Sequence, residues 1–165
     1  MVNRHTIRKC QQVDGEIIYS IINEAAKIYK GVIPADCYHQ PYMNRDELNK
    51  EMKRVAFYGW EESNGLVAVM GIEPVQDTTL IRHAYVLPQR QRQGIGSNLL
   101  NYLKEKVTTS RLLVGTWADA SWAIDFYQKH GFVLLPDKDE LLNNYWDIPR
   151  RQIETSVVLG TALLP

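Results

Sequence analysis

The chain has 165 residues, of which 45% are hydrophobic and 23% are charged. This length fits one domain of ordinary size, and the composition excludes a disordered or low-complexity chain. Nineteen basic residues balance nineteen acidic ones, so the formal net charge is zero and no broad positive field is present to hold a nucleic acid partner.

The cysteine count and the two ends of the chain predict the compartment. Two cysteines, Cys10 and Cys37, are too few for the disulfide framework of a secreted small protein. The first residues begin no apolar run typical of a secretory signal, and the mostly apolar tail 157–165 is far shorter than the roughly 20 residues that span a bilayer. We therefore expect a cytoplasmic protein without a membrane partner.

The opening segment predicts a strand followed by a helix. Polar and apolar residues alternate over Thr6–Cys10, which is typical of a strand. Asp14 is positioned to cap a helix that runs to about Ile28. Its apolar residues recur at three-to-four spacing and are Ile17, Ile18, Ile21, Ile22, Ala25 and Ala26.

A loop and a second helix follow. Residues 29–41 contain one glycine and two prolines, so we expect a loop. Asn44 and Glu47 have the spacing of a capping box, which marks the start of a helix. The buried stripe of this helix is Leu48, Met52 and Val55.

The middle of the chain predicts three strands. Ala56–Trp60 and Leu66–Ile72 flank Ser63-Asn64-Gly65, and Asn-Gly between apolar runs indicates a hairpin. We expect Pro74 to end this pair of strands. A third strand spans Thr78–Leu87 and ends at Pro88.

The second half predicts two helices and three strands. A helical stripe begins at Ile95, and its other members are Leu99, Leu100, Leu103 and Val107. A buried strand, Arg111–Trp117, precedes a helix over Asp119–His130, which Gly131 caps. The remaining predicted strands are Phe132–Leu135 and Ile153–Leu159, separated by a mixed segment. The chain is thus expected to form one α/β domain over residues 1–165, with a mixed sheet of about seven strands and about four helices.

The junction between the strand Thr78–Leu87 and the next helix has the character of an anion site. After Pro88, two glycines, Gly94 and Gly96, stand where the helix begins, and Arg90 and Arg92 add positive charge. The first turn of a helix leaves backbone N–H groups unpaired, and glycines let a phosphate approach them closely. Taken alone, the pattern also fits an ordinary strand-to-helix turn, and neither the dinucleotide fingerprint nor the P-loop motif is present.

Two motifs in this part of the chain resemble one family. Gln91-Arg92-Gln93-Gly94-Ile95-Gly96 resembles the Gln/Arg-x-x-Gly-x-Gly/Ala signature of the GNAT superfamily of acyl-CoA N-acyltransferases. Residues 120–132, Ala-Ser-Trp-Ala-Ile-Asp-Phe-Tyr-Gln-Lys-His-Gly-Phe, are similar to its second hallmark, Ala-x-x-Phe-Tyr-x-x-x-Gly-Phe. The resemblance extends over roughly residues 6–159. Many relatives carry asparagine where Ala120 stands, so one polar cofactor contact is absent here.

The resemblance implies acetyl-CoA as co-substrate and no metal. It implies that the fourth and fifth strands splay, with the pyrophosphate on the glycine loop and the pantetheine arm beside the fourth strand. It also implies that the Val86 N–H stabilises the thioester oxyanion. The implied cofactor-binding residues are Ala84, Tyr85, Val86, Gln91, Arg92, Gln93, Gly94, Ile95, Gly96, Ser97, Ala120, Ala123 and Tyr127.

The resemblance further implies that Tyr127 is the general acid that protonates the departing CoA thiolate. A thiol pKa near 8.5 and a phenol pKa near 10 are close enough for proton transfer. Helical spacing puts the small residues Ala120 and Ala123 on the face of Tyr127, which leaves room for a pantetheine arm. The alternative is a structural tyrosine in the core.

The base that deprotonates the amine is less defined. Relatives carry an acid or histidine at positions that match Leu80 and Arg82, neither of which can serve here. We take Glu73 as the catalytic candidate. His83, which strand alternation directs to the opposite face, Glu154 on the last strand, and a chain of waters stay open as alternatives.

The acceptor is predicted to be a primary amine of a small molecule or peptide, and a homodimer is possible. Aromatic residues of the first long loop have faces suited to a cationic amine, although packing within the loop is the favoured explanation; they are Tyr29, Tyr38, His39 and Tyr42. Cys37 and His39 lack further close ligands, so no metal site is expected. The competing functions are a non-catalytic acyl-CoA sensor and a nucleotide-binding regulator.

Overall fold

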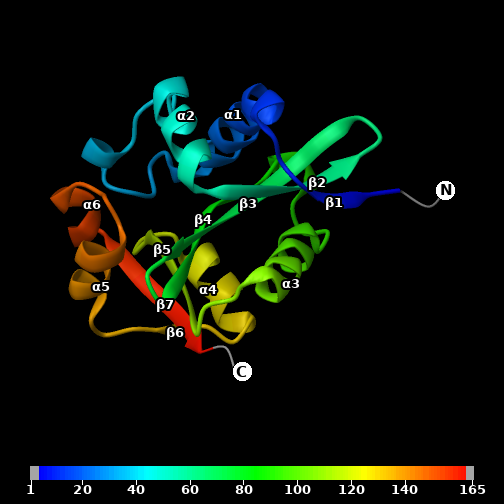
Figure 1. Ribbon diagram of the computed structural model, residues 1–165. Coiled ribbons are helices and arrows are strands. Elements are labelled where there is room, and N and C mark those ends of the chain that lie inside the picture. Colours follow the sequence, from blue (N-terminus) through cyan, green and yellow to red (C-terminus); the bar gives the residue numbers. More distant parts are fainter. Residues whose placement is uncertain (1–3, 163–165) are drawn as a thin grey trace. The chain divides into compact units, whose positions relative to one another are not determined.

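The computed structural model describes residues 4–162 (Figure 1). The strands in this part of the chain form one mixed sheet. The seven strands are β1 (Thr6–Lys9), β2 (Ala56–Glu62), β3 (Gly65–Val75), β4 (Thr78–Val86), β5 (Arg111–Trp117), β6 (Val133–Leu134) and β7 (Ser156–Ala162). Their hydrogen-bonded order is β1-β2-β3-β4-β5-β7-β6. The predicted α/β class and strand number are confirmed.

Six α-helices accompany the sheet within residues 4–162. They are α1 (Gly15–Ala25), α2 (Arg45–Arg54), α3 (Ile95–Lys106), α4 (Ser121–Lys129), α5 (Lys138–Tyr145) and α6 (Arg150–Glu154). Four of them were predicted, whereas α5 and α6 were not. These two are short, and the apolar pair of α5, Leu141 and Leu142, is adjacent rather than spaced by a helical turn, so the sequence has no clear periodicity there.

The chain divides into two compact units. The first unit contains residues up to Ile28 together with Gln40–Glu73 and Arg82–Val107. The second unit contains Tyr29–His39, Pro74–Ile81 and the residues from Thr108 onward. The boundary passes through β4, whose first four residues belong to the second unit.

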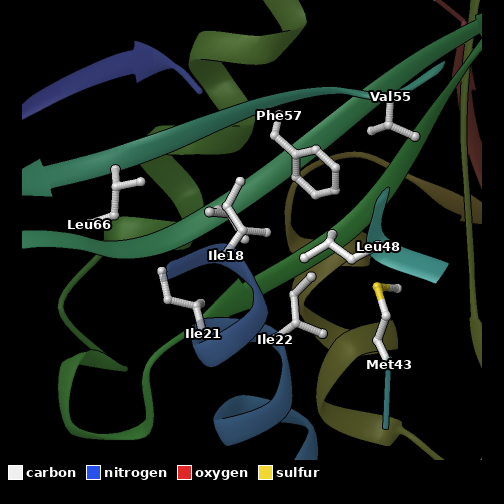
Figure 2. Close-up of a cluster of buried hydrophobic side chains, with 9 residues drawn as sticks. Ile18, Ile21, Ile22, Met43, Leu48, Val55, Phe57 and Leu66 are labelled. Carbon is white, nitrogen blue, oxygen red and sulfur yellow. The ribbon is translucent and has the colours of Figure 1, made fainter. Parts of the chain in front are cut away.

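The core of the first unit lies between its helices α1 and α2 and its strands. Figure 2 shows three isoleucines of α1 and Leu48 of α2 pointing toward Phe57 of β2 and Leu66 of β3; the three are Ile18, Ile21 and Ile22. The predicted stripe members Ile18, Ile21 and Ile22 are fully buried. Burying a side chain of this size stabilises the fold by about 1.5–3 kcal/mol relative to an exposed position.

The two predicted caps have different outcomes. The Asn44 side chain accepts a hydrogen bond from the Glu47 N–H at 2.8 Å, so Asn44 caps α2 as predicted. The Glu47 carboxylate accepts a hydrogen bond from the Asn44 side-chain amide at 3.0 Å instead of from the backbone N–H that completes a capping box. Asp14 precedes α1 but makes no capping hydrogen bond with that helix. Its carboxylate instead accepts two hydrogen bonds from Arg8, both at 2.9 Å, because a bidentate charged partner outweighs a cap.

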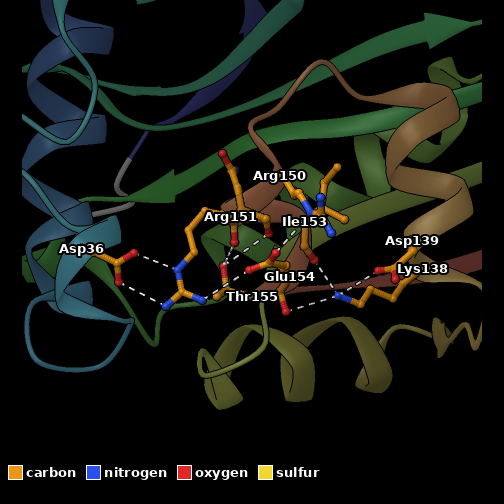
Figure 3. Close-up of polar contacts among 9 residues, drawn as sticks. Asp36, Lys138, Asp139, Arg150, Arg151, Ile153, Glu154 and Thr155 are labelled. Carbon is orange, nitrogen blue, oxygen red and sulfur yellow. Dashed lines mark hydrogen bonds and ion pairs between the residues drawn. The ribbon is translucent and has the colours of Figure 1, made fainter.

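The second unit is built on the antiparallel pair β5 and β7, which runs from Arg111↔Ala162 to Trp117↔Ser156. Its core contains Leu80, Leu113, Leu141, Leu142 and Val158. Figure 3 shows the Asp36 carboxylate facing the Arg151 guanidinium, with oxygen–nitrogen distances of 2.8 and 3.2 Å. This ion pair joins the loop 29–39 to α6.

The parallel strands β4 and β5 separate along their length. Their register runs from Thr78↔Arg111 to Ile81↔Val114 and no further. Nevertheless, β4 continues to Val86 and β5 to Trp117. The predicted splay between the fourth and fifth strands is therefore confirmed.

Several predicted boundaries are wrong. The last strand begins at Ser156, because residues 150–154 form α6 instead. Strand β3 continues through Pro74 to Val75, and β6 covers only Val133–Leu134. The end of the predicted apolar tail, residues 163–165, lies outside the described residues. No helix found in residues 4–162 is long and apolar enough to cross a membrane.

Candidate active site

The glycine loop before α3 has a backbone that only a few residue types tolerate. Gly94 occupies the N-cap position of α3 with φ of 81°, in the left-handed region. Arg92 is also left-handed, with φ of 62°. The first helical hydrogen bond joins the Asn98 N–H to the Gly94 carbonyl at 3.0 Å. Glycine is suited to this cap because it lacks the Cβ that makes left-handed backbone costly.

The backbone N–H groups of this loop are available to a ligand. The Gln91 N–H is engaged with the Pro88 carbonyl at 3.4 Å. In residues 4–162, no backbone hydrogen bond uses the N–H groups of residues 92–96. These groups lie at the positive end of the α3 dipole, so the segment can bind an anion such as a diphosphate.

The side chains of the loop differ in what they can contribute. The Arg90 guanidinium forms an ion pair with Glu62, which also accepts a hydrogen bond from the Trp60 indole at 3.3 Å. Arg90 therefore braces the loop against β2, and its charge is already balanced. Ile95 is buried in the core, so only its backbone can serve a ligand. The Gln91 amide donates to the Val86 carbonyl at 3.0 Å and fixes the loop against the end of β4.

The predicted residues on β4 form one short segment with the loop. Ala84, Tyr85 and Val86 are all half-buried and lie beyond the last β4–β5 pair. The Tyr85 side chain packs against the core of the first unit. Backbone groups of this segment are thus more accessible to a ligand than the Tyr85 ring.

The remaining predicted site residues lie on α4 in the second unit. Ala120 is the N-cap of α4 and is fully buried, whereas Ala123 is half-buried. Tyr127 is 5% exposed and lies edge-on to Phe126, with ring centroids 5.1 Å apart. Burial, together with the nearby Tyr29 phenol, raises the pKa of Tyr127. The phenol therefore stays protonated at physiological pH and remains a proton donor.

The aromatic residues of the predicted acceptor loop separate into two environments. The Tyr29 ring stacks on Trp122 of α4, with centroids 6.0 Å apart. Tyr42, in contrast, packs against the core of the first unit. Tyr29 therefore contacts the helix that carries Tyr127.

A network of charged residues lies in the first unit. Glu73 and Arg82 were considered from the sequence, whereas Glu51 and Arg54 were not. Glu51 of α2 accepts hydrogen bonds from Arg54 at 2.8 Å and from Arg82 at 3.4 Å. Arg82 also donates to Glu73 at 2.9 Å. The predicted base Glu73 is therefore held in an ion pair. Glu51 falls three residues after buried Leu48 and four before buried Val55, so a charge on the apolar face of α2 was the available signal.

His83 does not follow the strand alternation that was predicted for it. Its φ is 56°, and this left-handed residue interrupts the regular pleat of β4. As a result, the adjacent Arg82 and His83 both contact the Glu51 carboxylate. The expectation that His83 occupies the face opposite to Arg82 is wrong.

The His83 ring is enclosed. It stacks on Phe57, with centroids 5.8 Å apart. Its Nε2 lies 3.2 Å from Glu51 Oε2, close but not aligned for a full hydrogen bond, and neither atom has another partner within residues 4–162. Burial lowers the pKa of His83, against the opposing effect of Glu51. Burial alone raises the pKa of Glu51, but the close contact with His83, the hydrogen bond from Arg54 and the charge of Arg82 outweigh it and lower the pKa to about 2.

These shifts predict how stability depends on pH. The ordinary Glu51 pKa is 4.5, so the stabilisation is present above pH 4.5 and is lost as the pH falls towards 2. The lowered pKa of His83 adds destabilisation below its ordinary value of 6.5, since the unfolded chain then binds the proton more strongly. We expect the free energy of unfolding, measured by urea titration, to fall by roughly 3 kcal/mol through Glu51 between pH 5 and 2.

The matched variants are Glu51→Gln and Glu105→Gln. Glu51→Gln should be less stable at pH 7 but should lose much less stability on acidification. Glu105 is exposed on α3, so its replacement should leave the acid profile of the parent unchanged. An equal acid-dependent loss in Glu51→Gln and in the parent would contradict the role assigned to Glu51.

The chain is similar to known acetyltransferases in sequence and in fold. Residues 53–134 match the family model of the acetyltransferase (GNAT) domain. No curated protein matches the chain. Among solved structures, the PaiA N-acetyltransferase from Thermoplasma acidophilum in complex with coenzyme A is 15% identical, with TM-score 0.73, over 97% of this chain and 99% of that one.

Two further structures have the same fold over their full length. A GNAT family acetyltransferase from Staphylococcus aureus MU50 is 16% identical, with TM-score 0.75, over 98% of this chain and 100% of that one. A GNAT family acetyltransferase from Elizabethkingia anophelis with acetyl-CoA bound is 22% identical, with TM-score 0.69, over 99% of this chain and 100% of that one. Residues 53–134 of this chain therefore carry a GNAT acetyltransferase domain, and the chain has the same fold as these GNAT acetyltransferases.

Proposed function

We propose that the protein transfers an acetyl group from acetyl-CoA to a primary amine of a small molecule or peptide. The observation that carries this proposal is the run of unengaged N–H groups at residues 92–96, at the start of α3 and directly after the splayed end of β4. Such a run suits the diphosphate of coenzyme A. The GNAT domain match covers the same segment.

In this proposal the loop and the end of β4 hold the co-substrate. The N–H groups of residues 92–96 bind the diphosphate, and left-handed Gly94 lets it approach the backbone. Backbone groups of residues 84–86 bind the pantetheine arm, since β4 has no β5 partner there. The Val86 N–H stabilises the negative charge that develops on the thioester oxygen.

Tyr127 supplies a proton in the same reaction. Its raised pKa keeps the phenol protonated, and a buried thiolate also has a raised pKa, so the transfer from phenol to sulfur stays feasible. Glu73 is the sequence-based candidate for the base that receives the amine proton. Its carboxylate is held by Arg82, so accepting a proton would weaken that ion pair.

The test is calorimetry followed by an acetyl-transfer assay on the purified protein. We expect acetyl-CoA to bind more tightly than ATP or NAD, and coenzyme A to be released with at least one member of an amine panel of alkyl diamines, amino acids and peptides. Binding without release for any acceptor would favour the non-catalytic sensor. Tighter binding of ATP or NAD would favour a nucleotide-binding regulator.

A further inference from the structure

We propose that His83 and Glu51 form a dyad in which His83 Nδ1 takes the proton from the attacking amine and Glu51 positions the ring. This inference rests on the proposed acetyltransferase function and assigns its base to a different residue from Glu73. It starts from the contact between Nε2 of His83 and Oε2 of Glu51, 3.2 Å apart.

The charge state of Glu51 fixes which nitrogen of His83 carries hydrogen. With a pKa of about 2, Glu51 is ionised at every physiological pH and can only accept a proton or a hydrogen bond. A lone pair on Nε2 facing this carboxylate would be repelled, so Nε2 carries the hydrogen. The lone pair of the neutral ring is then on Nδ1, and Nδ1 is the nitrogen that can act as a base.

The groups around the ring favour its neutral form. Arg54 on α2 and Arg82 on β4 disfavour a positive charge on His83, and Glu51 opposes them. Glu73 on β3 is held by Arg82, and Phe57 on β2 covers one face of the ring. The two carboxylates and two guanidinium groups balance in number, so burial, the largest effect, lowers the pKa of His83 and leaves the ring uncharged at neutral pH.

The backbone at His83 explains how the ring reaches this position. A left-handed non-glycine residue in a strand is strained and is retained only where the surrounding structure holds it. The His83 side chain is 14% exposed, whereas its Nε2 is sealed, so the exposed surface belongs to other atoms of the side chain. His83 also stands three residues before Val86 on the part of β4 that belongs to the first unit.

The proposed step balances as follows. The amine lone pair attacks the thioester carbon, the carbonyl electrons move to oxygen, and the amine proton passes to His83 Nδ1. When the carbonyl re-forms, the carbon–sulfur bond breaks, its electron pair leaves with sulfur, and Tyr127 protonates the thiolate. His83 releases its proton to solvent, and the Tyr127 phenolate takes a proton from solvent. The products are the N-acetyl amine and free coenzyme A.

The main variants are chosen to suit the left-handed backbone. His83→Asn keeps a residue type that tolerates positive φ, and His83→Gly removes the side chain without backbone strain. We expect His83→Asn to lower kcat by about 100-fold with the acetyl-CoA KM unchanged. We expect added imidazole to restore about tenfold of the rate in His83→Gly and to have no effect on the parent. His5→Gln, at an exposed histidine of the same unit, is the matched control and should keep parental activity.

The pH profile separates a positioning role of Glu51 from a structural one. The parent kcat/KM should rise with pH through the His83 pKa, which lies below 6.5. Since Glu51 raises the His83 pKa, Glu51→Gln should move this rise in kcat/KM to lower pH. It should also lower the constant value that kcat/KM reaches at higher pH by about tenfold. If the rise of kcat/KM with pH is lost in Glu73→Gln and kept in His83→Asn, the dyad is overturned in favour of Glu73.

A second readout does not depend on turnover. Nitrogen NMR of histidine-labelled protein should show the Nε2–H form for His83 and a shift of its titration in Glu51→Gln. Observation of the Nδ1–H form would overturn the dyad. Failure of imidazole to rescue His83→Gly, together with an unchanged pH dependence of kcat/KM in His83→Asn, would also overturn it. Absence of any acetyl transfer by the folded parent would instead remove the proposed function, and with it the catalytic role of His83.

Discussion

Replacing Tyr127 with phenylalanine is expected to lower the rate of acetyl transfer by about 100-fold while the protein stays folded. The phenol is the proton donor to the CoA thiolate in the proposed reaction. Phenylalanine keeps the ring contacts with Phe126 and Phe132, so packing is preserved. The measurement is the single-turnover rate of coenzyme A release with the acceptor that the amine panel identifies.

Single-turnover conditions matter because slow product release can hide a change in the chemical step. Tyr102→Phe, on α3 in the first unit, is the matched control and should keep the parental rate. The parent should also show no alkaline loss of activity below about pH 10, because burial raises the pKa of Tyr127 above its ordinary value. An unchanged single-turnover rate in Tyr127→Phe would remove the phenol from this role.

Replacing Gly94 with alanine is expected to weaken acetyl-CoA binding by about 10- to 100-fold. A Cβ at this position has Asn98 Nδ2 as its nearest neighbour at 3.8 Å, so the protein itself has room for it. Alanine in this left-handed backbone, with φ of 81°, is strained by about 1 kcal/mol relative to glycine. In the proposed complex its methyl group also occupies space where the diphosphate approaches. Calorimetric titration with acetyl-CoA measures the change.

Gly31→Ala separates strain from ligand contact. Gly31 has φ of 77°, and a Cβ added there would meet no other atom within 4 Å, so alanine carries similar backbone strain outside the glycine loop. It should lower stability by a similar amount and leave acetyl-CoA affinity at the parental value. Equal affinities of both variants and the parent would argue against the diphosphate site.

The local elements of this protein were accessible from the sequence where short-range physics decides. The N-cap at Asn44 and the Asn-Gly turn involve neighbours in the chain, and both predictions are confirmed by the hydrogen bond at α2 and the β2–β3 hairpin. The splay of β4 and β5 was implied by family resemblance and not by any local pattern. The short helices α5 and α6 were missed because eight and five residues are too few for a clear period.

In the candidate site, too, local features were predictable from the sequence and distant contacts were not. The glycine loop was predicted because backbone N–H groups at a helix start depend on the local chain alone. Arg90 was expected to add charge to that loop, but Glu62, 28 positions away, balances it. Glu154 was expected on the last strand and lies instead in α6, where it pairs with Arg150 and Arg151.

The sequence by itself determined the fold class, the strand number, the glycine loop and the tyrosine on its helix, because periodicity and motifs are properties of neighbouring residues. Only the tertiary structure decided the surroundings of His83. A single left-handed residue turned its ring towards Glu51, which is 32 positions earlier in the chain. Such a contact depends on how a helix packs on a strand, and no local pattern contains that information.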